Sequence, residues 1–288
     1  MKSFLKFVAI FGSILLISAF LAPILFDFLP FKFERIFNRI VMIGTLLAIV
    51  IFVRIKKETL VRFGLKWGKE SLGLLSIGFL AGFLVLACNE AVRVFLGHAS
   101  WSPQDLSWTA WLGKIGAALG TGLLIGVIEE FFFRGFILRS LFSITKQRVF
   151  VSMLITALFY SIIHFIGMKK IFVGPDPTFI DGLRLIGAPF VSLAEWPRFW
   201  PEAVGLFLFG WALNGATFRT GSLYPCIGLH AGCVMFIRLD DLFLKFQGPQ
   251  SFFWGSKIIY DGVVGWVSLI LVGVILWFLL KPVERKTF

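Results

Sequence analysis

The chain has 288 residues, of which 58% are hydrophobic and 15% are charged, and its mean hydropathy is +0.90. Soluble domains average about 25% charged residues, so this composition excludes an ordinary soluble globular protein. The formal net charge of +12 does not indicate a nucleic-acid partner, because the Lys and Arg residues lie mainly in the connections between apolar runs. In such connections, cations fix the orientation of a protein in the lipid bilayer.

Apolar runs long enough to cross a hydrocarbon core about 30 Å thick recur along the chain. The apolar start is longer than the core of a secretory signal, so we expect it to be a first membrane helix. The predicted fold is an all-α, polytopic membrane helical bundle forming a single domain over residues 1–288. Its spans are predicted at residues 4–24, 37–54, 72–95, 110–140, 149–167, 201–218, 222–238 and 260–280.

The distribution of cations predicts the orientation of these spans. The connection "RIKKETLVRFGLKWGK" is dense in Lys and Arg, whereas "GHASWSPQDLSWTAW" has none and carries three tryptophans. Cytoplasmic loops carry the excess of Lys and Arg, and tryptophan is enriched at membrane interfaces. We therefore expect a multi-pass protein of the cell membrane with both termini in the cytoplasm.

The longest connection and the three cysteines are given structural interpretations, without a role in function. The segment 168–200 contains "GPDP", "GAP" and "EWPRFWP", which argue against a continuous helix, and it either caps the bundle or simply connects two spans. Cys88, Cys226 and Cys233 all fall within apolar segments without a CxxC pair, so we expect them to be buried small hydrophobic residues, neither disulfide-bonded nor metal-binding.

Polar residues inside the predicted spans are the candidates for function, because they are costly in lipid and usually face the bundle interior. They are Glu129, Glu130 and Arg134 in "GVIEEFFFRG", His164 in "FYSIIHF" and His230 in "CIGLHAG". Glu129 and His164 lie about equally far from the turn expected near Lys146 and Gln147. A carboxylate and two imidazoles at one depth would form a water-activating or metal-binding site.

Structural interpretations compete with this one. Glu130 and Arg134 are four residues apart, so an ion pair on one helix face is the simplest explanation for both. Glu129 then needs another partner. A single histidine in a membrane helix often only hydrogen-bonds to a neighbouring helix. Two glycine pairs in "GAALGTGLLIG", Gly116–Gly120 and Gly122–Gly126, predict close packing of this helix against another.

The motifs resemble those of the CPBP family of intramembrane proteases, which includes the type II CAAX prenyl endopeptidases and bacteriocin-processing and self-immunity proteins. "EEFFFR" matches the family's EExxxR, "YSIIH" matches FxxxH with Tyr160 in place of Phe, and "FLFG" matches FxxG. "RTGSLYP" resembles a habitual turn of the family. "HAGCV" keeps the histidine of HxxxN but has Val234 at its last position. The resemblance implies a catalytic core over residues 110–240.

By this resemblance, Glu129 would activate a water molecule, His164 would orient that water, and His230 would stabilise the oxyanion. Glu130 and Arg134 would hold the helix. Because losing one oxyanion donor costs about 10²–10³ in rate, Val234 calls for a substitute donor, either Asn214 or Tyr160, or else indicates a weakened member. The implied substrate is a membrane-associated or hydrophobic peptide. The family's spread, together with the cationic inner loops, implies a bacterial inner membrane.

Three alternatives stay open at the level of sequence. Glu129, His164 and His230 are compatible with a zinc site, although no HExxH spacing demands one. A non-catalytic immunity or binding protein on the same scaffold would explain Val234. A transporter would use the buried charges as an ion relay, but the chain has no internal repeat to favour one.

Overall fold

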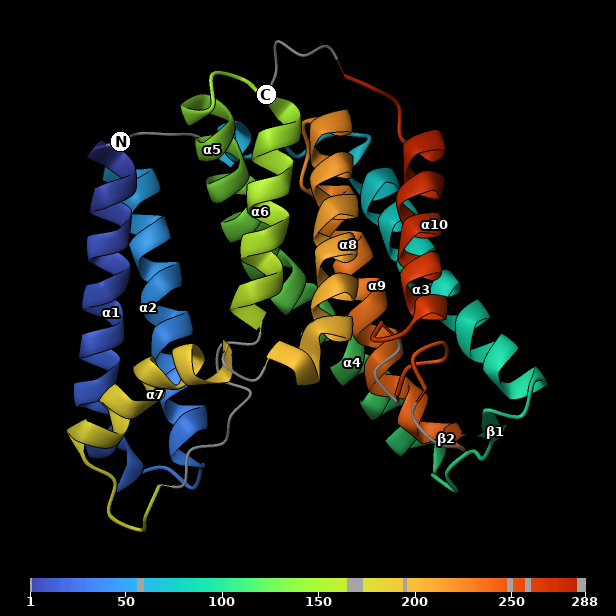
Figure 1. Cartoon of the computed structure of the whole chain (residues 1–288), viewed down its shortest axis with the longest axis horizontal. Coiled ribbons are helices and arrows are strands. Elements are labelled where there is room, and N and C mark those ends of the chain that lie inside the picture. The colour runs from blue at the N-terminus through green and yellow to red at the C-terminus, as the bar shows by residue number, and fades with distance from the viewer. Residues whose placement is uncertain are drawn as a thin grey trace. The chain divides into compact units, whose positions relative to one another are not determined.

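The computed structural model describes residues 2–55, 60–164, 173–193, 196–247, 251–256 and 260–283. All eight predicted spans are helical in this part of the chain, and residues 165–167 of the fifth lie outside it. The fold is an all-α membrane bundle (Figure 1). Its longer elements are α1 (Lys2–Phe26), α2 (Phe33–Ile55), α3 (Ser71–Phe95), α4 (Trp108–Glu130), α6 (Val149–His164), α7 (Phe179–Leu193), α8 (Trp196–Thr220), α9 (Tyr224–Leu239) and α10 (Val263–Leu279).

Shorter elements connect these helices. They are the 3-10 helices η1 (Leu60–Phe63) and η3 (Asp240–Leu242), the π-helix η2 (Phe131–Leu138), the helix α5 (Arg139–Ile144) and the strands β1 (Ala99–Trp101) and β2 (Leu244–Phe246). The two strands pair antiparallel, with Ser100 opposite Lys245. The predicted turn near Lys146 and Gln147 is present, and both residues adopt positive φ angles there.

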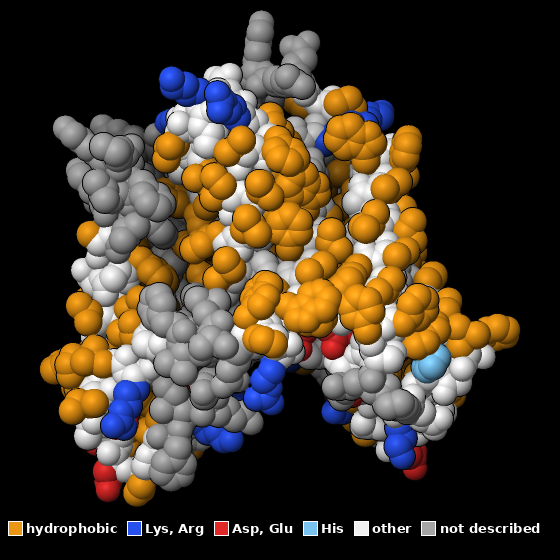
Figure 2. All heavy atoms as spheres, viewed as in Figure 1, with side chains coloured by type: hydrophobic (Ala, Val, Ile, Leu, Met, Phe, Trp, Pro, Cys, Tyr) orange, Lys and Arg blue, Asp and Glu red, His pale blue; other side chains and the backbone are white. Residues whose placement is uncertain are grey.

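The lengths of the helices agree with a membrane environment. Within the described residues, Ala9–Phe26, Ser71–Phe95 and Trp108–Ile144 are long and apolar enough to cross a bilayer by length and composition. Val149–His164 and Val263–Leu279 are shorter apolar helices. Figure 2 shows hydrophobic side chains covering the middle of the face that α6, α8 and α10 present. Such exposed apolar side chains are stable where lipid, instead of water, surrounds them.

The chain divides into two compact units, of which the first contains residues 1–59 and 162–199. Its core combines Ala19 and Ala22 of α1 with Phe33, Ile36 and Phe37 of α2. Helix α7 packs on α1 so closely that a Cβ on Gly182 would lie 2.6 Å from Ala19 Cα. The small residues at this crossing let the two backbones approach each other.

Helix α7 fills part of the segment 168–200, which the sequence predicted not to be one continuous helix and which is non-helical at residues 173–178. Residues 179–193 are helical, including the "GAP" piece, and the "EWPRFWP" piece opens α8 at Trp196. Leu185 and Ile186 of α7 pack against the core of the first unit. The packing of α7 in the first unit outweighs the local preference of its glycine and proline for turns.

The second unit contains residues 60–161 and 200–288. Helix α9 lies at its centre, between α3 and α4, and is buried along most of its length. Glycines make this possible on both sides. A Cβ on Gly228 would lie 2.0 Å from the carbonyl oxygen of Leu75 on α3, and one on Gly122 of α4 would lie 2.7 Å from that of Ala231. No larger side chain fits at either crossing.

The glycine pairs predicted on α4 differ from each other in their packing. Gly122 and Gly126 face α9, as expected, whereas a Cβ on Gly116 or Gly120 would meet no atom of the described residues within 4 Å. The prediction was therefore wrong for the Gly116–Gly120 pair. Helix α9 also packs against the first half of α4, but through Trp111 and Ala118. Gly116 and Gly120 therefore lie on a different face of α4 from the one that α9 contacts.

The cysteines are free thiols, and one of them is not where the sequence predicted. Cys226 and Cys233 are buried in α9, but Cys88 is exposed on α3. An apolar residue in a membrane helix can face lipid as well as the protein core, so hydrophobicity alone does not predict burial in the protein.

Arg93, near the end of α3, is a buried cation. Its guanidinium contacts the carboxylate of Glu90 at 3.2 Å and donates to the carbonyl oxygens of Ser256 at 3.1 Å and of Trp254. The ring of Phe246 on β2 lies 5.6 Å from the guanidinium carbon. Arg93 thereby ties the loop 251–256 to α3.

Candidate active site

The helix that carries the first motif changes its geometry within that motif. The α-helix α4 ends at Glu130, and the π-helix η2 begins at Phe131 and contains Arg134. π-helical turns are rare and are frequent at functional sites, because their i→i+5 hydrogen bonds widen the helix and shift the positions of its side chains. The sequence predicted only a regular helix here.

Glu130 and Arg134 form the predicted ion pair, and both side chains are fully buried. Arg134 Nη1 donates to Glu130 Oε1 at 3.2 Å. Taking either charge out of water is costly, so removing one partner would leave the other uncompensated. The pair joins α4 to η2 across the change in helix geometry.

His230 of α9 lies between the two adjacent carboxylates. Its Nδ1 is 3.0 Å from Glu130 Oε1, and its Nε2 is 3.9 Å from Glu129 Oε2. The Nδ1–H tautomer is the one that can donate to the carboxylate oxygen that Arg134 also contacts, and it leaves Nε2 facing Glu129. The ring of Phe209 packs edge-on against the imidazole, with 5.6 Å between the ring centres. Glu130 and Phe209 thus fix the orientation of His230.

The two glutamates differ in their access to solvent. The side chain of Glu130 is fully buried, whereas that of Glu129 is 28% exposed. Gly126, one turn earlier on α4, brings the two helices together here, since a Cβ at this position would lie 3.0 Å from Ile227 O and 3.5 Å from His230 Cβ. Glu130 is therefore a partner within the protein, and Glu129 is the more exposed of the two side chains, although its Oε2, which faces His230, is buried.

Three further groups hold the guanidinium of Arg134. Its Nε donates to Asn214 Oδ1 at 3.2 Å, and its Nη2 donates to the carbonyl oxygen of Gly210 at 3.2 Å. The ring of Tyr160 lies beneath it, 4.5 Å from the guanidinium carbon to the ring centre. Asn214 in turn donates from Nδ2 to Met153 O at 2.9 Å. Arg134 thereby joins η2, α6 and α8.

This network gives Asn214 and Tyr160 a contact that sequence reasoning missed. Both were considered as replacements for an oxyanion donor, and both contact Arg134. Gly210, the last residue of the FxxG motif, also belongs here, because a Cβ on it would lie 3.1 Å from Tyr160 Cδ1 and 3.5 Å from Arg134 Nη2. The signal in the sequence was the glycine itself, since a glycine inside a membrane helix often marks a close approach.

The two remaining motif positions lie on α6 and α9. His164 is the last residue of α6 and belongs to the first unit. Val234 follows His230 by one turn of α9 and has no hydrogen-bond donor in its side chain.

Among the residues that the structure describes, no group of three or more His, Cys, Asp and Glu side chains is arranged to hold a metal ion. Glu129 and His230 supply two of the predicted zinc ligands, and the third, His164, lies in the other unit. A catalytic zinc takes three protein ligands, so a site of this kind would need His164 beside Glu129 and His230.

Comparison with known proteins agrees with the motifs. Residues 111–236 match the family described as type II CAAX prenyl endopeptidase Rce1-like. This segment is similar to that family. The resemblance predicted from the sequence is confirmed at the family level, and the family's members are CAAX-type membrane proteases. The Rce1-like segment contains Glu129, Glu130, Arg134 and His230 as well as the residues that hold Arg134.

A relative that aligns over more of the chain than this segment extends the similarity but adds no activity. The uncharacterized protein YyaK of Bacillus subtilis (strain 168) is 24% identical over 222 residues. The alignment covers 74% of this chain and 64% of that protein, so the chain spans less than two-thirds of its relative's length. No solved structure matches the chain.

Proposed function

We propose that the protein is an intramembrane endopeptidase that hydrolyses a peptide bond in a membrane-associated or hydrophobic peptide. The observation that supports this most directly is the position of His230 between two unequal carboxylates. Glu130 is buried and binds Nδ1, while the more accessible Glu129 faces Nε2. A carboxylate beside an oriented imidazole is the arrangement that water activation needs.

In this mechanism Glu129 accepts a proton from the attacking water. The hydroxide adds to the carbonyl carbon of the peptide bond, and the carbonyl oxygen becomes the oxyanion of a tetrahedral intermediate. His230 protonated at Nε2 would donate a hydrogen bond to that oxyanion. Glu129 then passes its proton to the leaving amine, and the carbon–nitrogen bond breaks.

His164 enters the proposal through the family resemblance alone, as the residue that orients the water. Its contribution is tested separately by His164→Ala. We expect cleavage to fall with this variant while the unfolding temperature of the second unit, which holds the rest of the site, stays the same.

Replacing each glutamate with glutamine tests the proposed division of roles. Glu129→Gln removes the base, so we expect the rate of cleavage to fall by about 10²–10⁴ with an unchanged unfolding temperature. Glu130→Gln is the matched control, because it makes the same substitution at the neighbouring glutamate. It leaves Arg134 without a charged partner, so we expect the free energy of unfolding to fall by about 1–3 kcal/mol. Cleavage is measured as new peptide N-termini in membranes of cells that produce each variant. An active Glu129→Gln protein would refute the proposal.

Val234 supports one alternative, a non-catalytic or weakly active immunity or binding protein on the same scaffold. In that case wild type and Glu129→Gln would both produce no new N-termini. Val234→Asn places a hydrogen-bond donor one turn after His230. If the protein is weakly active because it lacks only this donor, the substitution should raise the cleavage rate by up to about 10²–10³.

Removing metal tests whether zinc takes part. Two carboxylates and two histidines perform the chemistry above without a metal, so we expect a chelator to leave the activity of the purified protein unchanged. Elemental analysis of the purified protein is the second measurement. Zinc in a one-to-one ratio that is lost from Glu129→Gln and His230→Ala would instead assign these residues as ligands.

A further inference from the structure

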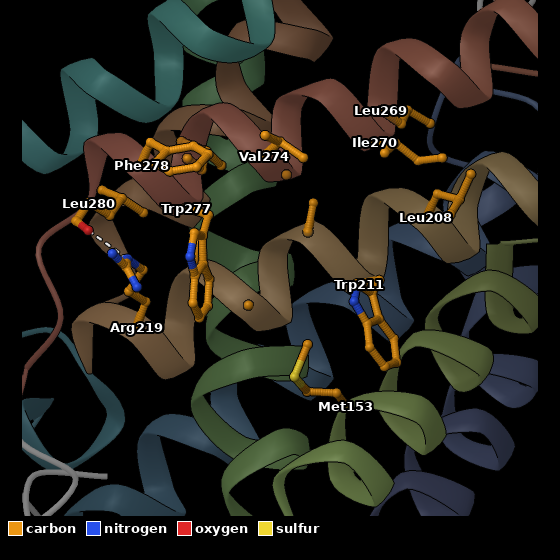
Figure 3. A pocket seen from close by; sticks show the side chains of 15 residues that line it. Met153, Leu208, Trp211, Arg219, Leu269, Ile270, Val274, Trp277, Phe278 and Leu280 are labelled. Atoms are coloured by element: carbon orange, nitrogen blue, oxygen red, sulfur yellow. Dashed lines mark hydrogen bonds between the residues drawn. The ribbon is translucent and has the colours of Figure 1, made fainter.

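An apolar groove runs along the second unit between α8 and α10, with a volume of about 480 Å³ (Figure 3). Small residues keep it open. A Cβ on Gly215 of α8 would meet only Met153 Cε, at 3.9 Å, among the described residues, and one on Gly273 of α10 would meet Ala212 Cβ at 3.6 Å. The two helices are therefore close at one level, while the space beside Gly215 stays unfilled.

The walls of the groove are apolar along their length. Figure 3 shows Leu208, Trp211, Ile270 and Val274 around the space. The adjoining surface of α10 is also apolar, because Val267, Leu271 and Phe278 are exposed, the last of them at 79%. A groove with these walls, between two helices that a bilayer surrounds, is in contact with hydrocarbon chains.

The end of the groove is cationic. Arg219, near the end of α8, lines it and donates from Nε to Leu280 O at 2.6 Å. Its guanidinium carbon lies 4.2 Å from the ring centre of Trp277. In the described part of the chain, its two terminal nitrogens have no hydrogen bond to protein, and no carboxylate lines the groove. Lys281, which follows Leu280, is exposed.

We propose that this groove binds an anionic phospholipid of the surrounding bilayer, with one acyl chain against Gly215 and the phosphate on Arg219. The apolar walls fit the chain, and the terminal nitrogens of Arg219 fit two phosphate oxygens, which is the fork geometry that guanidinium groups offer. Trp277 fits the same depth, because tryptophan side chains collect at the level of lipid headgroups. The phosphate of the lipid would also balance the positive charge of Arg219, which lies close to the hydrocarbon region.

Lipid retention by the purified protein tests the proposal. The full-length protein is reconstituted in nanodiscs of phosphatidylcholine with or without phosphatidylglycerol, and the lipids that stay bound are counted by native mass spectrometry. We expect wild type to retain phosphatidylglycerol in preference to phosphatidylcholine. Arg219→Gln should weaken retention of phosphatidylglycerol about fivefold, because one cation near the headgroup is lost. Gly215→Leu, which fills the groove, should reduce retention of both lipids.

Two variants serve as matched controls. Arg148→Gln removes an exposed cation of the same unit that does not line the groove, and Gly113→Leu makes the same substitution where a Cβ meets no described atom within 4 Å. Both should retain lipid as wild type does. Unchanged retention of phosphatidylglycerol by Arg219→Gln or by Gly215→Leu would overturn the proposal. So would a shift from dimer to monomer on Gly215→Leu, since a second copy would then occupy the groove.

Discussion

Arg134 is a fully buried cation whose three nitrogens all donate within the protein. Glu130, Asn214 and the carbonyl of Gly210 receive these hydrogen bonds, and the ring of Tyr160 covers one face of the guanidinium. A guanidinium with a rigid fork of donors can join several helices at once, which the single charge of a lysine cannot do. Arg134 therefore sets the positions of the groups around Glu130, and through Glu130 the orientation of His230.

Asn214→Ala tests this role of the Arg134 contacts. The substitution removes the acceptor for Arg134 Nε and the donor for the Met153 carbonyl, and both groups are buried. We expect the free energy of unfolding to fall by about 1–3 kcal/mol, measured by denaturant titration in detergent. Gln104→Ala is the control, because Gln104 is exposed and should change stability by less than about 0.5 kcal/mol. Equal stability of Asn214→Ala and wild type would contradict the role.

At the scale of elements, α9 is the helix on which the second unit is organised. It is short, with 16 residues, and it is held on one side by α3 and on the other by α4. The contacts are backbone to backbone, because glycines lie at the crossings. In a membrane, where burial of apolar surface gives little driving force between helices, such close packing supplies much of the stability. It also fixes the depth of His230 relative to Glu129.

Alanine substitutions distinguish the two kinds of glycine. Gly228→Ala places a Cβ 2.0 Å from the Leu75 carbonyl oxygen, so the helices must separate, and we expect a loss of about 1–3 kcal/mol or more in unfolding free energy. Gly116→Ala has room around it and should be neutral or stabilising by up to about 1 kcal/mol, because alanine favours helix. Similar effects of the two substitutions would show that the crossing is not close-packed.

At the scale of the whole molecule, cations and tryptophans predict which end of the bundle faces the cytoplasm. Ser102 lies in the tryptophan-rich connection between α3 and α4, and Lys146 lies in the cationic turn between α5 and α6. Both side chains are exposed. Since α4, η2 and α5 separate them, the two positions are at opposite ends of the second unit.

Cysteine labelling of intact cells tests this orientation. In a Cys88→Ser background, where the two remaining cysteines are buried, Ser102→Cys should react with a membrane-impermeant maleimide. Lys146→Cys should react only after the cells are permeabilised, since we expect this turn and both termini to be cytoplasmic. The reverse pattern of labelling would invert the topology.

The sequence by itself determined the features that depend on neighbouring residues. The length of each apolar run predicted the helices, and the four-residue spacing of Glu130 and Arg134 predicted their ion pair, because both follow from the pitch of a helix. The motifs from "EEFFFR" to "HAG" indicated the family for the same reason: each is a short pattern on one element. The roles of Glu129, His164 and His230 in catalysis remain predictions.

Only the tertiary structure decided the features that join distant parts of the chain. Asn214 binds Arg134 across 80 residues, and His230 binds Glu130 across 100. The helix α7 and the packing of only half of the glycines on α4 also depend on a neighbouring helix. The physical reason is common to all of them. In an apolar helix almost any residue can face lipid or protein, and only the partner that packs against it determines which.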